Sequence, residues 1–227
     1  MESNNPHLNR ILEQQLERTA KALRENRMEA VVVGTKQEAR DALERYLFPG
    51  CTIGVGGSAT LDEIDALTLF RSPAYRFFDR YTEGMTDEER KQIFREAMFA
   101  DVFAMSSNAI TETGLLYNVD GRCNRVAPLL YGPQSVVVVA GCNKIVPDLP
   151  AAVARVMRVA APANAVRLGK QTPCATTGIC AGIGKGDFPI CEGCQSPDRI
   201  CSGYVISARQ LVPNRIKVIL VAEPLGF

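Results

Sequence analysis

The chain has 227 residues, of which 46% are hydrophobic, so it can bury a sizeable core as one large α/β domain or two small ones. Lys and Arg total 26 and Asp and Glu total 25, and the formal net charge of +1 excludes a broad field that would attract nucleic acid or an anionic membrane. The longest apolar run, SVVVVAG, is far shorter than the roughly 20 residues of a membrane helix, so we expect no membrane span.

The chain begins with alternating helix and strand patterns. Residues 5–26 repeat apolar side chains with a 3.6-residue period, which predicts an amphipathic helix. The run AVVVG at 30–34 predicts a short strand that is covered on both faces. A second helix pattern covers 35–47, and CTIGVGG at 51–57 predicts a strand that ends in glycines.

Two threonines predict the starts of further helices. Thr60 and Glu63 have the spacing of a capping box, and so have Thr86 and Glu89. A helix is therefore expected directly after each threonine. The second of these helices leads into the apolar run DVFAMSS at 101–107, which predicts another strand.

The second half of the chain contains the clearest strand and a change of composition. SVVVVAG at 135–141 predicts a buried strand, and a helix pattern follows over roughly 149–161. Past Pro162 the sequence is rich in Gly, Pro and Cys, which predicts an irregular lobe, here called the cysteine lobe (about 170–203). The closing runs YVISAR and RIKVILVAE predict strands that return to the sheet edge or pair with each other.

This alternation predicts one α/β domain over 1–227 with a mainly parallel sheet flanked by helices, and the cysteine lobe within it. In such a sheet, the carboxyl ends of the strands form the crevice in which ligands bind. Three polar segments follow predicted strands and are therefore candidates for a binding site.

The first candidate segment is GVGGSAT, which precedes a predicted helix and therefore has N–H groups available for an anion. Its spacing fits neither a dinucleotide fingerprint nor a Walker loop. The alternative is a tight turn that needs glycine for its dihedral angles. The candidate binding residues are Gly54, Gly56, Gly57, Ser58 and Thr60.

The second candidate segment runs from 106 to 125. Glu112 could act as a general base if burial raised its pKa, and Arg125 could hold a carboxylate with two hydrogen bonds. The alternative is a polar hairpin whose Asn and Asp side chains only form turns. The candidate binding residues are Asn108, Thr111, Asn124 and Arg125.

The third segment, AGCNKIV, places Asn143 and Lys144 after the strongest strand, where Lys144 could stabilise an anion. The alternative is an ordinary solvated lysine. The only histidine, His7, lies in the first helix, so a Ser-His-Asp triad, a Cys-His pair and histidine-based zinc or iron sites all lack essential parts.

The cysteine lobe is the clearest candidate for a metal site. Its five cysteines are Cys174, Cys180, Cys191, Cys194 and Cys201. The polar amino terminus has no secretory signal, which predicts a cytoplasmic protein, and thiols stay reduced in that compartment. With no imidazole available, four thiolates suit Zn²⁺ or a [4Fe–4S] cluster, and one cysteine is left over.

The segments GVGGSATLDEI, NAITETGLLYNVDG, NRVAPLLYGPQSVVVVAGCNKIV and CQSPDRIC together resemble the LUD (lactate utilisation) domain family in its short form, from about residue 8 onwards. The resemblance implies a three-layer, Rossmann-like sandwich similar to ribose-phosphate isomerases and CoA transferases. It also implies a tail in which Cys174, Cys194 and Cys201 are ligands. Cys180 and Cys191 both fit the remaining position of the family's tail pattern, because eleven additional residues separate them.

The same resemblance implies that the protein binds a small organic anion and supports oxidation of lactate or a related 2-hydroxy acid, together with iron–sulfur partner subunits. One alternative is an isomerase or acyl/CoA-transfer enzyme acting on a phosphorylated or CoA-linked substrate, with Glu112 as base or nucleophile. Another is a non-catalytic sensor or assembly subunit with a structural zinc site. The sequence leaves homo-oligomerisation open.

Overall fold

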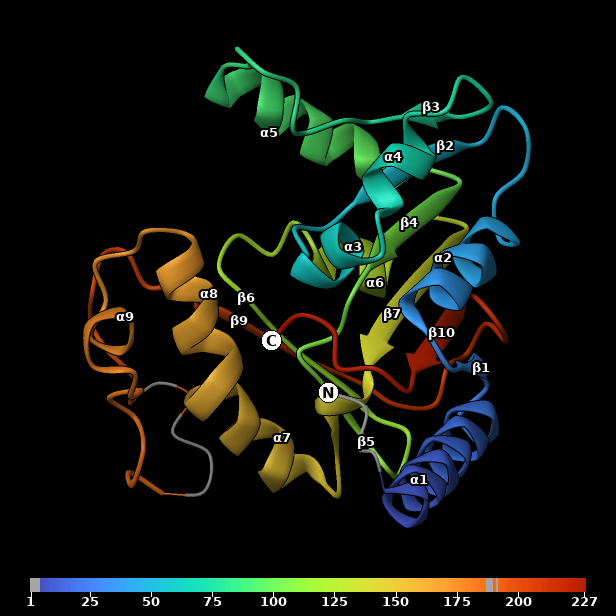
Figure 1. Ribbon diagram of the computed structural model, residues 1–227. Helices are drawn as coiled ribbons and strands as arrows, with labels where there is room; N and C mark the ends of the chain where they lie inside the picture. The colour runs from blue at the N-terminus through green and yellow to red at the C-terminus, as the bar shows by residue number, and fades with distance from the viewer. Residues whose placement is uncertain (1–4, 187–189, 191) are drawn as a thin grey trace.

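The computed structural model describes residues 5–186, 190 and 192–227 of the chain, and in these residues strands and helices form a mixed α/β fold (Figure 1). The strands lie in two sheets. The six strands of the large sheet, in spatial order, are β1 (Glu29–Val33), β10 (Ile216–Val221), β7 (Ser135–Gly141), β4 (Val102–Met105), β2 (Thr52–Val55) and β3 (Arg76–Phe77). Those of the small sheet are β8 (Ile145–Val146), β5 (Ala109–Thr111), β6 (Leu116–Asp120) and β9 (Gly203–Ser207).

Helices cover both faces of the large sheet. The described helices are α1 (Pro6–Glu25), α2 (Lys36–Glu44), α3 (Ala59–Glu63), α4 (Ala66–Phe70), α5 (Asp87–Glu96), α6 (Val126–Leu130), α7 (Leu149–Arg155), α8 (Ala161–Arg167) and α9 (Pro173–Thr177), with the short helices η1 (Ala97–Phe99), η2 (Cys142–Lys144) and η3 (Val156–Ala160). Side chains of α1 belong to one core cluster, and side chains of α2, α3 and α4 belong to the other. The Rossmann-like three-layer α/β fold predicted from the sequence is confirmed.

Successive residues of β7 point to opposite faces of the sheet. Val136 and Val138 pack in the cluster under α1, whereas Val137 and Val139 pack in the cluster under α2 to α4. All four side chains are fully buried. A strand that is covered on both faces needs apolar residues at every position, and this explains the unbroken valine run.

The sequence prediction placed the last two strands at the sheet edge or against each other, and it is wrong for β10. β10 lies inside the large sheet and pairs in parallel with both β1 and β7. Its run of consecutive apolar residues fits this central place, because both faces are buried there. β9 pairs antiparallel with β6 at the edge of the small sheet, and only its last residue, Ser207, is buried.

The predicted helix starts are half right. Thr86 and Glu89 form the expected capping box at the start of α5. The helix near Thr60 begins two residues earlier than expected, because Ser58 is the N-cap and its Oγ accepts a hydrogen bond from the backbone N–H of Leu61. Thr60 therefore lies inside the first turn of α3, and its hydroxyl is directed at the interior.

The helix predicted over roughly 149–161 continues to Arg167. α7, the π-helical turn η3 and α8 follow one another without a break, so Pro162 is inside the helix and does not end it. Proline lacks the N–H of a regular α-helical turn, and the wider π turn before it accommodates that loss. No helix in the described parts of the chain has both the length and the apolar character needed to cross a membrane.

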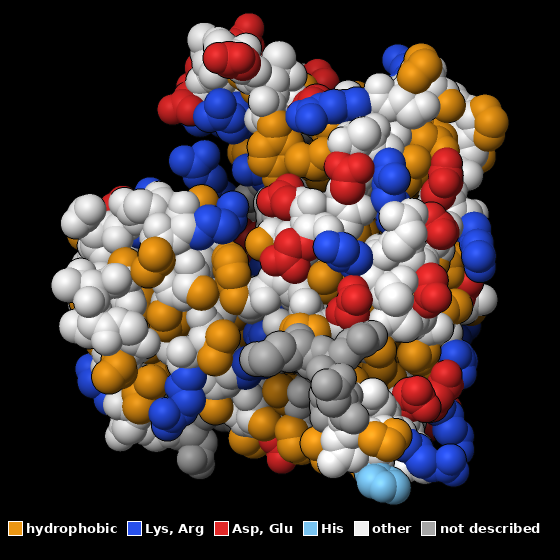
Figure 2. Space-filling view, in the orientation of Figure 1, with side chains coloured by type: hydrophobic (Ala, Val, Ile, Leu, Met, Phe, Trp, Pro, Cys, Tyr) orange, Lys and Arg blue, Asp and Glu red, His pale blue; other side chains and the backbone are white. Residues whose placement is uncertain are grey.

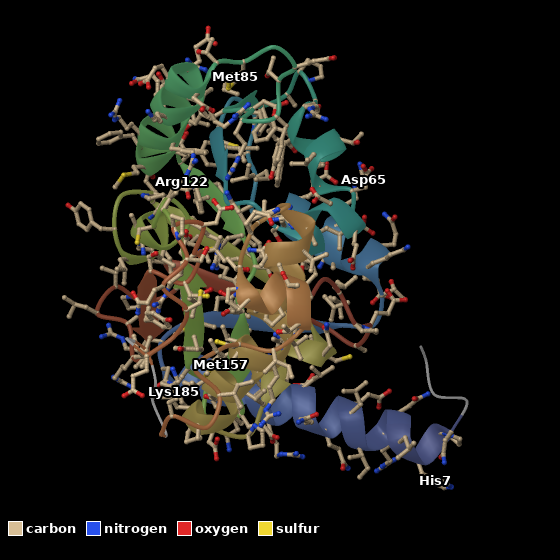
Figure 3. All side chains as sticks on the ribbon, turned by 90° about the vertical axis from the view of Figure 1, so that its left-hand side faces the viewer. His7, Asp65, Met85, Arg122, Met157 and Lys185 are labelled. Atoms are coloured by element: carbon tan, nitrogen blue, oxygen red, sulfur yellow. The ribbon has the colours of Figure 1, made fainter. Side chains whose placement is uncertain are left out.

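The amino-terminal turns of α1 extend beyond the sheet. Leu16 and Leu23 are fully buried, but Leu8 and Ile11 are 58% and 60% exposed. Figure 3 shows His7 at the outer end of this helix. The apolar stripe predicted for residues 5–26 therefore packs only in its second half.

Candidate functional site

A cleft of about 970 Å³ opens at the carboxyl ends of β2, β4 and β7. Gly57 and Ser58 follow β2, Ser106 follows β4, and Lys144 follows β7, and all four line the cleft. Residues of η3, α8 and the cysteine lobe form the facing wall. Figure 2 shows a hollow between the α7 to α9 region and α5, with Lys and Arg side chains gathered around it. The ligand crevice predicted for a parallel sheet is thus present.

The cleft is basic although the chain as a whole is nearly neutral. Among the described residues that line it, eight are basic and three are acidic. The basic residues are Arg80, Arg90, Arg122, Arg125, Lys144, Arg167, Lys170 and Arg199. The acidic residues are Glu83, Asp120 and Asp198. A cleft with one sign of charge focuses the field and favours an anionic ligand.

Lys144 is the most deeply buried of the cleft lysines, with 3% of its surface exposed. Its Nζ donates hydrogen bonds to Thr60 Oγ1 (2.7 Å) and Ser106 Oγ (2.9 Å). Burial lowers the pKa of Lys144 to about 7, and the nearby charges of Arg155 and Arg125 act in the same direction. The side chain therefore exists as both amine and ammonium near neutral pH.

Arg125 is buried too, but the protein satisfies its donors. Nη1 donates to Ser106 O (3.0 Å) and Asn118 Oδ1 (2.6 Å), and Nη2 donates to Asn108 Oδ1 and to the backbone oxygen of Val119, both at 2.8 Å. These bonds leave the guanidinium little capacity to hold a ligand carboxylate in the way the sequence predicted. Arg125 instead fixes the wall between β4 and β6.

Gly56 is required for this arrangement. A Cβ at this position would lie 2.6 Å from Cγ of Arg125, so a larger residue would displace the arginine. Gly54 is similarly packed, against Ala97 and Phe103. These two glycines of the predicted anion loop thus serve packing, while Gly57 and Ser58 line the cleft.

Four arginines of the cleft, Arg80, Arg122, Arg167 and Arg199, have no carboxylate partner among the described ion pairs. Arg199 is engaged by backbone carbonyls and Arg122 lies on the exposed rim, which leaves Arg80 and Arg167. The guanidinium of Arg80 lies over the ring of Phe94, 4.5 Å from its centroid, and close to the Gly57 backbone. Arg167 lies over the ring of Phe227 and donates to the neutral side chain of Asn164. Burial lowers the pKa of Arg80, and the positive charges of Arg90 and Arg167 add to this effect. These unpaired cations are the groups best placed to bind an anion.

The candidate segment from 106 to 125 forms the β5–β6 hairpin, and only one end of it reaches the cleft. Asn108 and Asn124 line the cleft. Thr111 lies at the other end, where its Oγ1 bonds Thr113 and accepts from the backbone N–H of Leu115.

Glu112 also lies at that far end. Its carboxylate accepts hydrogen bonds from Gln15 Nε2 (2.8 Å) and Arg18 Nη2 (3.2 Å) of α1. The structure therefore does not bring Glu112 together with Lys144. Asn143 is also outside the cleft lining, and its amide group bonds the backbone of Leu225 and Gly226.

Four cysteines of the cysteine lobe line one cavity of about 40 Å³, here called the cysteine cavity. They are Cys174, Cys180, Cys194 and Cys201. The other lining residues are mainly apolar and include Val156 and Ile190. Burial raises the pKa of the Cys201 thiol to about 12, and the other three cysteines contribute to the rise. The four thiols therefore lie within electrostatic reach of one another.

Hydrogen bonds to backbone carbonyls hold the cysteine lobe in place. The Arg199 guanidinium donates to the oxygens of Cys194 (3.1 Å), Cys201 (2.8 Å) and Ile190 (2.6 Å). Asp198 accepts from the backbone N–H of Gln171 and pairs with Lys170, which joins the two ends of the lobe. Cysteines that are far apart in the sequence are thereby brought to one cavity.

The described cysteines are free thiols. Cys191, the fifth predicted ligand, lies outside the described residues. Within the described residues, no three His, Cys, Asp or Glu side chains are gathered closely enough to hold a metal ion as they stand. The four thiols surround a cavity and do not converge on a single point.

The cysteine cavity and the basic cleft share a wall. Arg199, Ile200 and Cys201 line both spaces, and so do Val156 and Ala161 of the long helix. A group held by the thiols would therefore be one layer of residues away from a ligand in the cleft.

The sequence profile of the LUD domain matches residues 16–221. The chain belongs to the LUD domain family. This family is related to lactate utilisation, as the sequence segments predicted. No protein of curated function matches the chain.

Solved structures agree with this LUD domain assignment at the level of the fold. A DUF162 family protein from Deinococcus radiodurans is 14% identical, with a TM-score of 0.51 over 92% of this chain and 98% of that one. eIF2B beta from Chaetomium thermophilum is 13% identical, with a TM-score of 0.35 over 51% of this chain and 44% of that one, a likeness too small to argue from.

The sequence prediction missed several residues of the LUD domain cleft. Ser106 lies at the end of a predicted strand and opens the candidate segment 106–125, so the rule that placed Asn108 at the crevice could have found it. Arg80 and Arg167 gave no such signal. Arg80 lies in an irregular segment after β3, and Arg167 is at the end of a helix that was expected to stop earlier.

Proposed function

We propose that this LUD domain protein binds a small organic anion in the basic cleft and supports oxidation of a 2-hydroxy acid such as lactate, with an iron–sulfur cluster held by Cys174, Cys180, Cys194 and Cys201. The observation that carries the proposal is the wall shared by the cysteine cavity and the basic cleft. The protein would act in the cytoplasm, where these thiols stay reduced.

The thiols fit a cluster better than a single ion. A buried water needs about 10–15 Å³, and the cysteine cavity offers about 40 Å³. The cysteines surround this space, as a group of several atoms requires, whereas one zinc ion needs four ligands that converge at bonding distance. Bound there, a cluster would supply one-electron transfer.

Different residues of the basic cleft would bind the substrate and accept its proton. Arg80 and Arg167, which lack carboxylate partners, would attract the anion and pair with its carboxylate. Oxidation of a 2-hydroxy acid releases two electrons and two protons. The amine form of Lys144 can accept the proton of the substrate hydroxyl, and the second proton would pass to water in the open cleft. The two electrons would leave one at a time past Cys201 to iron–sulfur partner subunits.

Anaerobic purification followed by iron, sulfide and zinc analysis tests the lobe. The expected result is about four iron and four sulfide per chain with a brown absorption spectrum. Zinc without iron would instead support a structural module in a sensor or assembly subunit. If the protein contained neither iron nor zinc, the proposed role of the cysteine lobe would be overturned.

Ligand binding to the cleft is tested separately by the thermal shift that L-lactate causes, with lactamide as the uncharged analogue. Lactate is expected to raise the melting temperature and lactamide to leave it unchanged. Arg80→Met should abolish the shift, and Arg76→Met, outside the cleft, should retain it. Equal shifts with both compounds would contradict recognition of the anion.

A further inference from the structure

Lys144 has an environment that leaves its amine chemically available. The residue is in η2, at the end of the central strand β7, and its side chain lines the basic cleft. Its Nζ bonds two hydroxyl groups, those of Thr60 and Ser106. No described carboxylate forms an ion pair with it.

The direction of these hydrogen bonds matters. Thr60 Oγ1 donates to the backbone oxygen of Leu225 (3.3 Å), and Ser106 Oγ donates to the backbone oxygen of Ser107 (3.4 Å). Each hydroxyl has only one hydrogen, so each must accept from Lys144. A neutral amine has two N–H groups, which these acceptors satisfy, and one lone pair, which stays free. An ammonium would have a third N–H with no partner among the described residues.

The charges that face Lys144 favour the neutral form as well. Arg155, on the helix that follows, and Arg125, at the start of α6, are both cations, while Glu63 of α3 opposes them weakly. The Glu63 carboxylate is engaged by the backbone N–H of Gly226. A buried, uncharged lysine amine that lines a cleft is the arrangement that nucleophilic lysines use towards carbonyl compounds.

We propose that Lys144 forms a covalent imine with a 2-oxo acid bound in the basic cleft. The lone pair of Nζ attacks the carbonyl carbon and forms a C–N bond, and a proton moves from nitrogen to the former carbonyl oxygen. The second nitrogen proton then joins that hydroxyl, which leaves as water as the C–O bond breaks and the C=N bond forms. No electrons are exchanged with any other group, so the step needs no oxidant or reductant.

The ligand class follows from the charge of the cleft and rests on the proposed function. Arg80 and Arg167 favour a carbonyl compound that is also an anion. Oxidation of a 2-hydroxy acid produces a 2-oxo acid, so the product of the proposed reaction has both the carboxylate and the carbonyl group. The imine would hold this product in the cleft.

Trapping by reduction tests the inference. The full chain is incubated with pyruvate and sodium cyanoborohydride, which reduces an imine to a stable secondary amine. Intact-mass analysis is expected to find one reduced pyruvyl group per chain, and peptide mapping is expected to place it on Lys144. Lys144→Met should lose the adduct, whereas Lys91→Met, on α5 and outside the cleft lining, should keep it.

The controls separate this inference from the proposed function. Peptide mapping of the wild-type chain needs no variant, so it decides the site even if Lys144→Met does not fold. A thermal shift with pyruvate but no adduct on Lys144 would overturn the imine and leave anion binding intact. If pyruvate caused no thermal shift and formed no adduct, both the imine and the proposed anion binding would be overturned. An adduct spread over several lysines would also contradict the inference.

Discussion

The two walls of the basic cleft are built in different ways. The sheet-side wall carries Lys144, Ser106 and Arg125, which are positioned by the carboxyl ends of buried strands and by the β5–β6 hairpin. The lobe-side wall carries Arg199 and Cys201, which are held by bonds between one guanidinium and the backbone carbonyls of an irregular segment. The first wall is fixed by the fold itself, whereas the second depends on a few side chains and on what the thiols hold.

The largest expected effect is on the lobe-side wall. Cys201→Ala removes one of four proposed ligands, so we expect the iron content after anaerobic purification to fall close to zero. Cys51→Ala, a buried cysteine of the sheet core, is the matched control and should keep its iron. Equal iron content in the two variants would contradict the assignment of the thiols.

On the sheet-side wall, Arg125→Met should lower the free energy of unfolding by about 3–5 kcal/mol, because it removes the cation that pairs with Asp120 and leaves several buried acceptors without their donor. Denaturant titration measures this. Arg122→Met, on the exposed rim, is expected to change stability by less than about 1 kcal/mol. A similar loss in both variants would show that Arg125 is not the brace of this wall.

Lys144 should affect the pH dependence of stability. Its pKa is lowered by burial from 10.5 to about 7, so between these values the unfolded chain binds more protons than the folded chain. The free-energy cost of burying the charged form of Lys144 is therefore fully present below about pH 7, and the free energy of unfolding rises as the pH increases towards 10.5. Since each pKa unit is about 1.4 kcal/mol, the change is on the order of a few kcal/mol.

Guanidinium unfolding at pH 6 and pH 9 measures this slope. Lys144→Met should flatten the rise, because methionine cannot be protonated, whereas Lys91→Met should follow the wild-type profile. The variant also loses the hydrogen bonds to Thr60 and Ser106, but that loss of stability is the same at both pH values and does not affect the slope. Parallel profiles for all three proteins would contradict the buried, depressed lysine.

The smallest effect is expected at Glu112. Its partners belong to α1 and Arg18 is largely exposed, so Glu112→Gln should cost no more than about 1 kcal/mol. It should also leave the thermal shift with lactate unchanged, because the carboxylate does not line the basic cleft. Loss of the thermal shift with lactate in this variant would contradict the placement of Glu112 outside the binding site.

The sheet-side wall was largely predictable from the sequence because its signals are local. The valine run of β7 and the polar residues after β4 and β7 indicate buried strands with a crevice at their ends. The rule failed for Glu112, since the strand β5 carries the chain roughly 13 Å away from Asn108 at about 3.3 Å per residue. A hairpin has two ends, and the sequence did not indicate that Glu112 lies at the far one.

The lobe-side wall was not predictable in the same way. The cysteines identified a candidate metal site, but the bonds of Arg199 join segments whose contact depends on tertiary structure. The central place of β10 was missed for a similar reason, because strand order is not encoded in the local pattern. Pro162 was misread because a π turn allows the helix to continue.

The central claim is that the thiols hold a cluster directly beside an anion site. Electron paramagnetic resonance of the anaerobically purified, dithionite-reduced protein, recorded with and without L-lactate, tests it most directly. We predict an iron-dependent signal that lactate shifts in the wild type but not in Arg80→Met. Absence of an iron-dependent signal, or a signal unchanged at a lactate concentration that saturates the thermal shift, would contradict the account.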